Sequence, residues 1–359
     1  MQRAKTMSDD IKICVLLTSV GGLVAPGIIE NLRRIPEVSR IVGIDAANDA
    51  IGFYMVDESY SVPKGNEPKY MDALLEVIEK ECVDLIIPAS DEEVLTLSVH
   101  KEFLRDKGVT VLCSPPDITS AAIDKGSMLT FLKKREVCVP RFYLPETKKD
   151  LVKAAEELGY PEKPVVVKPR EGRGGRGFRI LKEQINVLHT RDSSEMKLKW
   201  LLEVISELEI TKLLVMEYLP GDEYSVDVLA DNGSTLFVVP RKRIRAILGP
   251  SQLGEVVWNQ EVVVMVVTVV KQFGFSCNVN IQLKYSAHSG GKPLVLEINP
   301  RISGTIVASA AAGMDLLREG IRYALGLRPT IPQMTIPHSI RMIRYLKEHF
   351  VESYGGARE

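Results

Sequence analysis

The sequence lacks an apolar run long enough to cross a membrane as a helix. Its longest aliphatic stretch, EVVVMVVTVV at residues 261–270, is about half of one span. The first twelve residues, MQRAKTMSDDIK, contain no apolar segment of the kind found in signal peptides. Five cysteines are scattered without metal-ligand spacing. We therefore expect a protein of the reducing cytoplasm with no membrane partner.

An excess of one charge is also missing, because 46 Lys and Arg face 47 Asp and Glu. Without a basic field, nothing in the composition indicates nucleic acid as a partner. No Ser, Cys or His stands in a recognisable nucleophile motif. The chemistry that remains plausible is electrostatic. A chain of 359 residues can hold one large domain or two to three ordinary domains.

Near the C-terminus, two strand-like runs flank a turn at residues 288–291 (HSGG). If they form a hairpin centred between Ser289 and Gly290, Gln282 lies opposite Glu297, and Asn299 shares the face of Glu297. Arg301 is next on that face if the strand continues. Three oxygen-bearing side chains then meet, a set that suits Mg²⁺ (or Mn²⁺) completed by waters and substrate phosphates. The alternative is a solvated polar hairpin face.

A glycine-rich segment lies at residues 165–178 (VVVKPREGRGGRGF). It reads as a buried strand ending at Lys168, followed by glycines interleaved with arginines. Such a loop can bring backbone N–H groups close to phosphate, and Lys168 would supply charge from the strand below it. A flexible hairpin tip is the simpler alternative, and the Walker motif is absent.

A third segment, residues 213–230, reads as strand, Pro-Gly turn and strand, with Glu217 and Glu223 flanking the turn. By itself it describes a β-hairpin with acidic surface residues.

The first 115 residues alternate predicted strands and helices, which indicates a parallel, Rossmann-like sheet. The strands are expected at 11–17, 40–45, 84–88 and 109–114, and the helices at 27–35 and 70–81. Asp45 follows a glycine-rich turn at the distance of a ribose-binding acid, but residues 19–24 do not form G-x-G-x-x-G. We therefore favour a structural and substrate-cleft role over dinucleotide binding.

Pro115-Pro116 marks the expected end of this domain. Beyond it, helices are expected at 119–136, which carries Lys125, at 148–160 and at 196–208. Residues 259–274 are rich in valine and favour a strand by propensity, but their length favours a buried helix.

In this order, the segments around Asp124-Lys125, Lys168 and the glycine-rich loop, MEYLPGDEYSVD and LEINPRISG resemble the ATP-grasp superfamily over residues 116–330. The carbamoyl-phosphate synthase large-subunit type, with Gln as first metal ligand, is the nearest in character. The resemblance implies an α/β fold with a Rossmann-like pre-ATP-grasp domain at 1–115. An ATP-grasp α+β domain at 116–359 would follow, with a mobile lid at about 140–216.

The resemblance also implies roles for single residues. Arg301 would lie near the transferred phosphate, and the hairpin residues would be the metal ligands. The residues implied for ATP binding are Lys125, Lys168, Gly172, Gly174, Gly175, Gly177, Glu217, Tyr218, Leu219 and Glu223.

The implied reaction joins a small carboxylate and an amine: ATP phosphorylates the carboxylate, and the amine displaces phosphate to give an amide. Arg241 and Arg243 would orient the acceptor carboxylate, because a planar guanidinium suits that group, although a basic run is more often a solvated face. The alternatives are an enzyme that phosphorylates bicarbonate or carbamate, a kinase releasing a stable phosphorylated product, and a regulatory nucleotide-binding protein without turnover. A homodimer is the commonest assembly for such a protein.

Overall fold

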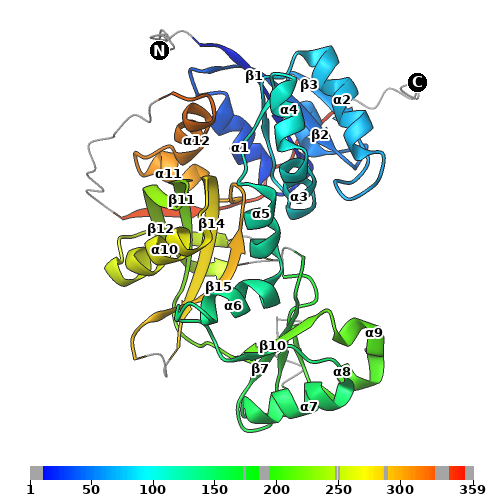
Figure 1. Ribbon diagram of the computed structural model, residues 1–359, viewed down its shortest axis with the longest axis vertical. Coiled ribbons are helices and arrows are strands. Elements are labelled where there is room, and N and C mark those ends of the chain that lie inside the picture. The colour runs from blue at the N-terminus through cyan, green and yellow to red at the C-terminus, as the bar shows by residue number, and fades with distance from the viewer. Residues whose placement is uncertain are drawn as a thin grey trace.

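The computed structural model describes residues 11–172, 175–185, 194–246, 249, 251–286, 290–327 and 339–351. In this part of the chain, the strands form three sheets. The N-terminal sheet lies at the top of Figure 1, the largest sheet in the middle and a small sheet at the bottom. No helix in these ranges combines the length and apolar character that a membrane span needs.

The N-terminal sheet is parallel, with strand order β3-β2-β1-β4-β5, which confirms the Rossmann-like prediction. The strands are β1 (Ile13–Leu17), β2 (Val38–Asp45), β3 (Glu58–Ser61), β4 (Leu85–Ile87) and β5 (Thr110–Val111). The helices are α1 (Ala25–Leu32), η1 (Ile51–Tyr54), α2 (Tyr70–Glu81), α3 (Asp91–Val99) and α4 (Lys101–Asp106). The sequence prediction missed β3, a polar edge strand, and both α3 and α4.

This sheet shares a hydrophobic core with the C-terminal part of the chain. Val15 and Ile28 of the N-terminal domain belong to the same buried cluster as Leu229 and Leu316. The carboxylate of Glu37 receives hydrogen bonds from Arg318 at 3.0 Å and Arg322 at 2.6 Å. Packing and ion pairs therefore fix the first domain against the helices that follow the large sheet.

The single helix expected at 119–136 is wrong, because the chain breaks at Asp124. Helix α5 (Pro116–Ile123) ends there and α6 (Lys125–Lys133) begins. The Asp124 carboxylate accepts the N–H of Ser127 at 2.6 Å, the usual way in which an N-cap satisfies the free donors of a first turn. It also pairs with Arg170 at 2.9 Å. Lys125 is consequently the first residue of a helix and not a mid-helix residue.

The small sheet has strand order β6-β10-β7-β8-β9. Its elements are β6 (Phe142–Tyr143), α7 (Lys148–Glu157), β7 (Val165–Pro169), β8 (Arg179–Leu181), β9 (Glu195–Met196), α8 (Leu198–Val204), α9 (Glu207–Ile210) and β10 (Leu213–Glu217). The single helix expected at 196–208 is wrong. Ser206 and Glu209 form a capping box that starts α9 as a separate turn.

The large sheet is antiparallel, with strand order β15-β14-β11-β12-β13-β16. Its strands are β11 (Glu223–Asp231), β12 (Ser234–Ala246), β13 (Ser251–Val256), β14 (Cys277–Tyr285), β15 (Pro293–Asn299) and β16 (Ile340–Ile343). The helices that accompany it are α10 (Gln260–Phe273), α11 (Val307–Ala311) and α12 (Leu316–Ala324). Because β10 and β11 belong to different sheets, residues 213–230 are a crossing between sheets and not the simple hairpin that they resemble alone.

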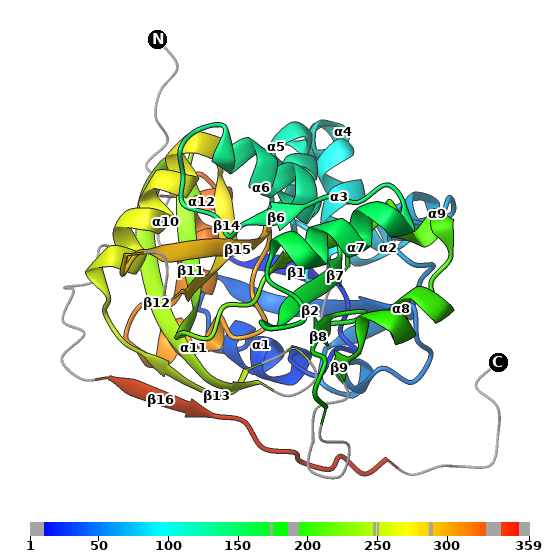
Figure 2. The same ribbon diagram turned by 90° about the horizontal axis from the view of Figure 1, so that it is seen from below.

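The valine-rich segment is a helix, as its length predicted. Asn259 caps α10 by accepting the N–H of Val262 at 3.1 Å, and Gly274 ends it with a φ of 78°. One face packs on the sheet through Val262, Val266 and Val269. In both ribbon views, α10 lies at the edge of the molecule (Figures 1 and 2).

Candidate functional site

The hairpin formed by β14 and β15 has the predicted register at its centre. Gln282 pairs with Glu297, and Asn280 pairs with Asn299, so all four side chains share one face. Closer to the turn the register changes, because Leu283 pairs with Val295 and leaves Leu296 as a bulge. Ser289 lies outside the described residues. Strand β15 ends at Asn299, so Arg301 reaches the site from a turn and not from a continued strand.

The bulge at Leu296 frees a carbonyl for Lys168. The Lys168 Nζ atom donates to the Leu296 oxygen at 3.3 Å. Burial lowers the pKa of Lys168 to about 8, and nearby Glu297 partly offsets this effect. The ammonium therefore lies at the hairpin and close to the Glu297 carboxylate, so the structure brings the predicted phosphate-binding lysine near one of the predicted metal ligands.

Lys125 is held next to the glycine-rich loop. Its Nζ atom donates to the Gly172 oxygen at 2.9 Å, and its backbone N–H donates to the Arg170 oxygen at 2.9 Å. Lys125 also contributes to lowering the pKa of Lys168, because two ammonium groups repel each other. Both predicted lysines therefore adjoin the loop.

The glycine-rich loop uses conformations that other residues rarely adopt. Gly172, Gly175 and Gly177 have φ values of 109°, 71° and 72°. At Gly177 a Cβ atom would also approach Pro169 Cγ to 2.7 Å, so both backbone and space require glycine there. The predicted loop residue Gly174 lies outside the described residues.

The segment proposed to lie beside adenine connects the small and large sheets. Glu217 at the end of β10 accepts the N–H of Arg141 at 2.8 Å. Tyr218 lies with the Lys284 ammonium 6.0 Å from its ring centre, and Leu219 is buried. The carboxylate of Glu223 pairs with Arg243 and lies 3.6 Å from Lys284. In this structure, the partners of the Glu223 carboxylate are therefore the cationic side chains of Arg243 and Lys284.

Arg243 and Arg301 both lie at the hairpin face. Arg243 donates to Gln282 Oε1 at 3.2 Å and to the Gly249 carbonyl at 2.6 Å. Arg301 donates to Asn299 Oδ1 at 3.3 Å and pairs with Asp91 of the N-terminal domain at 2.7 Å. Two guanidinium groups thus flank the predicted metal ligands.

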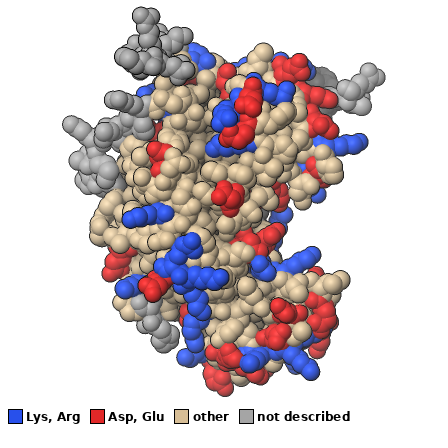
Figure 3. Space-filling view, viewed as in Figure 1, with Lys and Arg blue, Asp and Glu red and all other residues tan. Residues whose placement is uncertain are grey.

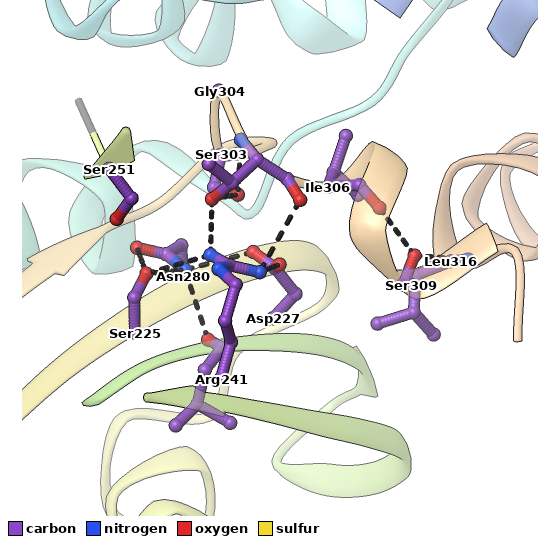
Figure 4. Close-up of polar contacts among 12 residues, drawn as sticks. Ser225, Asp227, Arg241, Ser251, Asn280, Ser303, Gly304, Ile306, Ser309 and Leu316 are labelled. Atoms are coloured by element: carbon purple, nitrogen blue, oxygen red, sulfur yellow. Dashed lines mark hydrogen bonds and ion pairs between the residues drawn. The ribbon is translucent and has the colours of Figure 1, made fainter. Parts of the chain in front are cut away.

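Arg241 is placed differently from the prediction (Figure 4). It is fully buried and pairs with Asp227 at 2.8 Å, Ser225 at 3.1 Å and the hydroxyl of Thr305. With no exposed surface, it has no way to contact an acceptor carboxylate. Arg241 instead supports the wall of the site from behind, because a buried guanidinium needs its carboxylate partner.

The same polar network contains Asn280, which the sequence analysis missed. Its Nδ2 atom donates to Asp227 Oδ1 at 2.8 Å and to Ser225 Oγ at 3.0 Å (Figure 4). Its Oδ1 atom lies 3.5 Å from Asn299 Nδ2. Strand alternation could have found it, because Asn280 lies two residues before Gln282 on the same face.

These residues line a cleft of about 830 Å³ between the N-terminal domain and the large sheet. Its lining includes Arg243, Gln282, Glu297, Asn299 and Arg301 on one side, and the Ser303-Gly304-Thr305 loop beside them. From the N-terminal domain it includes Ser19, Asp45 and Glu93. The predicted nucleotide-binding residues 125, 168, 217–219 and 223 do not line this cleft and lie beside it.

Asp45 has a structural partner within the N-terminal domain. Its carboxylate accepts the N–H groups of Gly21 at 2.7 Å and Ala47 at 2.9 Å, which fixes the loop after β1. This agrees with the structural role favoured from the sequence.

The donor set at the hairpin suits a hard divalent cation that keeps several other ligands. Glu297 makes no hydrogen bond to another described side chain and is partly exposed, so its oxygens remain free to bind a cation. Among the described residues, no group of three His, Cys, Asp or Glu forms a closed metal centre. A site with one carboxylate and two amides fits Mg²⁺ shared with phosphate rather than a cation held by protein alone.

Family models match both parts of the chain. Residues 15–112 match the PylC-like N-terminal domain, and residues 209–348 match the model described as ATP-grasp in the biosynthetic pathway with Ter operon. The chain therefore contains a region that matches an ATP-grasp family model, preceded by a region that matches a PylC-like N-terminal domain.

The sequence is also similar to curated proteins. The arginine-specific large chain of carbamoyl phosphate synthase from Halalkalibacterium halodurans is 28% identical over 72% of this chain and 24% of its own length. The chain spans about a quarter of the length of the curated relatives that it matches.

Solved structures share the fold. Biotin carboxylase from Campylobacter jejuni aligns with a TM-score of 0.65 at 17% identity, over 91% of this chain and 73% of that one. The L-amino acid ligase from Bacillus licheniformis aligns with a TM-score of 0.63 at 16% identity, over 89% and 75%. These structures therefore support the same overall fold, with a parallel N-terminal sheet followed by the region that matches the ATP-grasp model.

Proposed function

We propose that this protein is an ATP-dependent ligase that joins a small carboxylate to an amine. The observation that carries the proposal is the meeting of Gln282, Glu297, Asn299 and Arg301 in one cleft, with the Lys168 ammonium beside the hairpin that bears Glu297. The arrangement supplies charge and positions the reactants. Phosphoryl transfer requires these two contributions and does not require a nucleophile from the protein.

In the proposed reaction, a carboxylate oxygen attacks the γ-phosphorus of ATP, the bond to ADP breaks, and an acyl phosphate forms. The amine nitrogen then attacks the acyl carbon, phosphate leaves, and the nitrogen loses its proton to give the amide. Lys125 and Lys168 would hold the triphosphate, and Gly172, Gly175 and Gly177 would let the loop approach it. When bound at Gln282, Glu297 and Asn299, magnesium would neutralise the charge on the phosphoryl oxygens.

Arg243 and Arg301 would orient the acceptor carboxylate, since both guanidinium groups reach the cleft. Glu223 would bind the ribose after exchanging its present cation partners, and residues 217–219 would lie beside adenine. Residues 140–216 would act as a lid over the nucleotide.

A second candidate is an enzyme that phosphorylates bicarbonate or carbamate. The likeness to carbamoyl phosphate synthase large chains favours it, and its chemistry would use the same residues. The two candidates differ in the acceptor and not in the phosphate-binding machinery.

The test is magnesium-dependent phosphate release from ATP, screened over pooled amino acids, other small carboxylates with amines, and bicarbonate. We expect release that needs both a carboxylate and an amine. Glu297→Gln should lower it on the order of 100-fold, because a ligand to the charge-neutralising cation is lost. Glu255→Gln is the matched control, since Glu255 lies on the same sheet and pairs with Arg341.

Each outcome of this screen decides between the candidate functions. Release with bicarbonate alone would replace the ligase by the second candidate. ATP binding without release in any pool would contradict both and point to a regulatory nucleotide-binding protein. Equal activity of Glu297→Gln and Glu255→Gln would remove Glu297 from the site.

A further inference from the structure

Arg344 is the first residue after strand β16, and its side chain joins two segments of the cleft wall. Its Nη1 atom donates to the Ser251 carbonyl at 3.0 Å, and its Nη2 atom donates to the Gly304 carbonyl at 2.8 Å. Ser251 begins β13, whereas Gly304 follows β15, and both residues line the cleft. One guanidinium therefore connects two parts of the wall that come from different regions of the sequence.

Strand β16 brings Arg344 to this position. The strand pairs antiparallel with β13, with Ile343 opposite Leu253, and it lies beside β13 in Figure 2. The backbone N–H of Arg344 continues this pairing, because it donates to the Gln252 carbonyl at 2.8 Å. The backbone is fixed in this way, and the planar guanidinium has N–H groups in fixed directions that can hold two carbonyls at once.

The charge of Arg344 is not balanced by a neighbouring carboxylate. No Asp or Glu in the part of the chain that the structure describes forms an ion pair with it. Burial lowers the pKa of Arg344, and the nearby Arg241 guanidinium adds to this effect. A partly buried cation beside a second cation does not favour folding. Residues that break such a rule are expected at functional sites.

The contact with Gly304 is the anchor of Arg344. A Cβ atom on Gly304 would approach Val24 Cγ1 to 2.7 Å, so the loop of residues 303–305 packs tightly against the segment that begins α1. Figure 4 shows this loop and Ser251 together above Asn280 and Arg241. Arg344 thus ties Ser251 to a loop that is already fixed by the N-terminal domain.

The contact with Ser251 leads to Arg243. While the Ser251 carbonyl accepts from Arg344, its Oγ atom accepts the Nε–H of Arg243 at 3.1 Å. Arg243 in turn donates to Gln282 Oε1 in the cleft at 3.2 Å. A displacement of Ser251 would therefore shift the guanidinium that is proposed above to orient the acceptor carboxylate.

We propose that Arg344 is a positioning residue for the acceptor, acting through Ser251 on Arg243. It does so without contact to a substrate, because its side chain is not among those that line the cleft. The inference rests on the proposed function, in which Arg243 orients the acceptor. It assigns the segment that follows β16 a part in acceptor binding and none in ATP binding.

The test compares the steady-state constants of Arg344→Gln and wild type for the acceptor that the activity screen identifies. We expect the KM for the acceptor to rise about tenfold, because Arg243 loses its fixed position, and the KM for ATP to change less than about twofold. Arg344→Lys should recover part of the loss, since an ammonium also donates to carbonyl oxygens. Arg341→Gln is the matched control on the same strand, because Arg341 is exposed and pairs with Glu255. It should change neither constant.

A double-mutant cycle separates positioning from a general loss of structure. In an Arg243→Gln background, Arg344→Gln should raise the KM for the acceptor less than about twofold, because the residue through which it acts is already lost. Equal effects of Arg344→Gln in the two backgrounds would overturn the proposal. Equal increases in the KM values for the acceptor and for ATP would do the same.

Hydrogen exchange of the full chain without substrates gives a readout that does not depend on turnover. Arg344→Gln should speed exchange of the amides of residues 251–256 at least about threefold relative to Arg341→Gln, with α6 unchanged. Circular dichroism melting confirms that both variants are folded. Unchanged exchange at 251–256 would overturn the proposal even in an active enzyme. Faster exchange there, with no acceptor-dependent activity in any pool, would support the anchoring of Ser251 and contradict the proposed function alone.

Discussion

At the residue scale, Lys168 combines a buried ammonium with the position proposed above for phosphate binding. Its pKa is lowered to about 8, chiefly by burial. A lysine whose pKa falls on folding destabilises the nucleotide-free protein below that pKa, and this cost is relieved as the pH rises from about 8 toward 10.5. Folding therefore disfavours the positive charge that Lys168 would offer to ATP in the proposed function.

We predict that Lys168→Met stabilises the nucleotide-free protein at pH 7 by about 1–3 kcal/mol while it weakens ATP binding at least about tenfold. Urea unfolding and calorimetric titration with ATP measure the two effects. If Lys168→Met destabilises the protein, burial of the Lys168 ammonium does not lower the free energy of unfolding.

For the wild-type protein, ATP affinity should fall as the pH rises above about 8, because Lys168 loses its proton. Lys168→Arg keeps its charge throughout this range, so its affinity should stay flat with pH even if it is lower. Parallel pH profiles for the two proteins would rule out Lys168 as the titrating group.

The hairpin shows why some of the site was predictable from sequence. Opposition of Gln282 and Glu297 needs only the position of a turn, because paired residues in a hairpin have a constant sum. The bulge at Leu296 was not predictable in this way, since the lysine that uses its carbonyl lies 128 residues earlier. Burial of Arg241 also depends on its contacts with Asp227 and Thr305, and no local sequence pattern predicts these contacts.

At the scale of elements, the break between α5 and α6 determines where Lys125 lies. Asp124 caps α6 and binds Arg170, which begins the glycine-rich loop. Residues 119–136 have continuous helical character in the sequence. The helix breaks at Asp124, whose partner Arg170 lies 46 residues away in the chain. Helical periodicity alone therefore predicted one helix where tertiary contacts made two.

We predict that Asp124→Ala destabilises the protein by about 1–2 kcal/mol through loss of the cap and also weakens ATP binding, because Lys125 follows the cap. Thr147→Ala removes an equivalent cap from α7 and should lower stability similarly without changing ATP affinity. Asp124→Asn should keep most of the helix stability, since asparagine is also a good N-cap. Equal ATP affinities for Asp124→Ala and Thr147→Ala would contradict this link.

At the scale of the whole molecule, the N-terminal domain is built into the rest of the protein. Ion pairs from Arg318 and Arg322 to Glu37 and the shared core join segments almost 300 residues apart. Burial by itself would raise the pKa of Glu37, but hydrogen bonds from the two arginines outweigh it and lower the pKa to about 2.

We predict that Glu37→Gln lowers the free energy of unfolding by about 2–4 kcal/mol at pH 7, because two guanidinium groups lose their buried partner. Since the folded pKa is depressed, this stabilisation is present above about pH 4.5 and is lost as the pH falls toward 2. The difference between wild type and variant in urea unfolding should shrink over that range.

Glu102→Gln is the control, because its ion pair with Arg105 is exposed on both sides (66% and 68%), and it should change stability by less than about 1 kcal/mol. The shared core also predicts one cooperative unfolding transition for both domains. Two separated transitions, with Glu37→Gln affecting neither, would contradict it.

The small sheet joins the rest of the molecule through two neighbouring stretches of chain. The chain enters it after α6 and leaves it between β10 and β11, where the N–H of Glu217 donates to the Arg141 carbonyl at 3.0 Å. Two adjacent attachment points define a line, and a rigid body fixed at both retains a single degree of freedom, rotation about that line. A rigid rotation of the small sheet about that line would break the contacts of Lys168 with Leu296 and of Arg170 with Asp124, and it would carry Lys168 along one arc relative to Glu297.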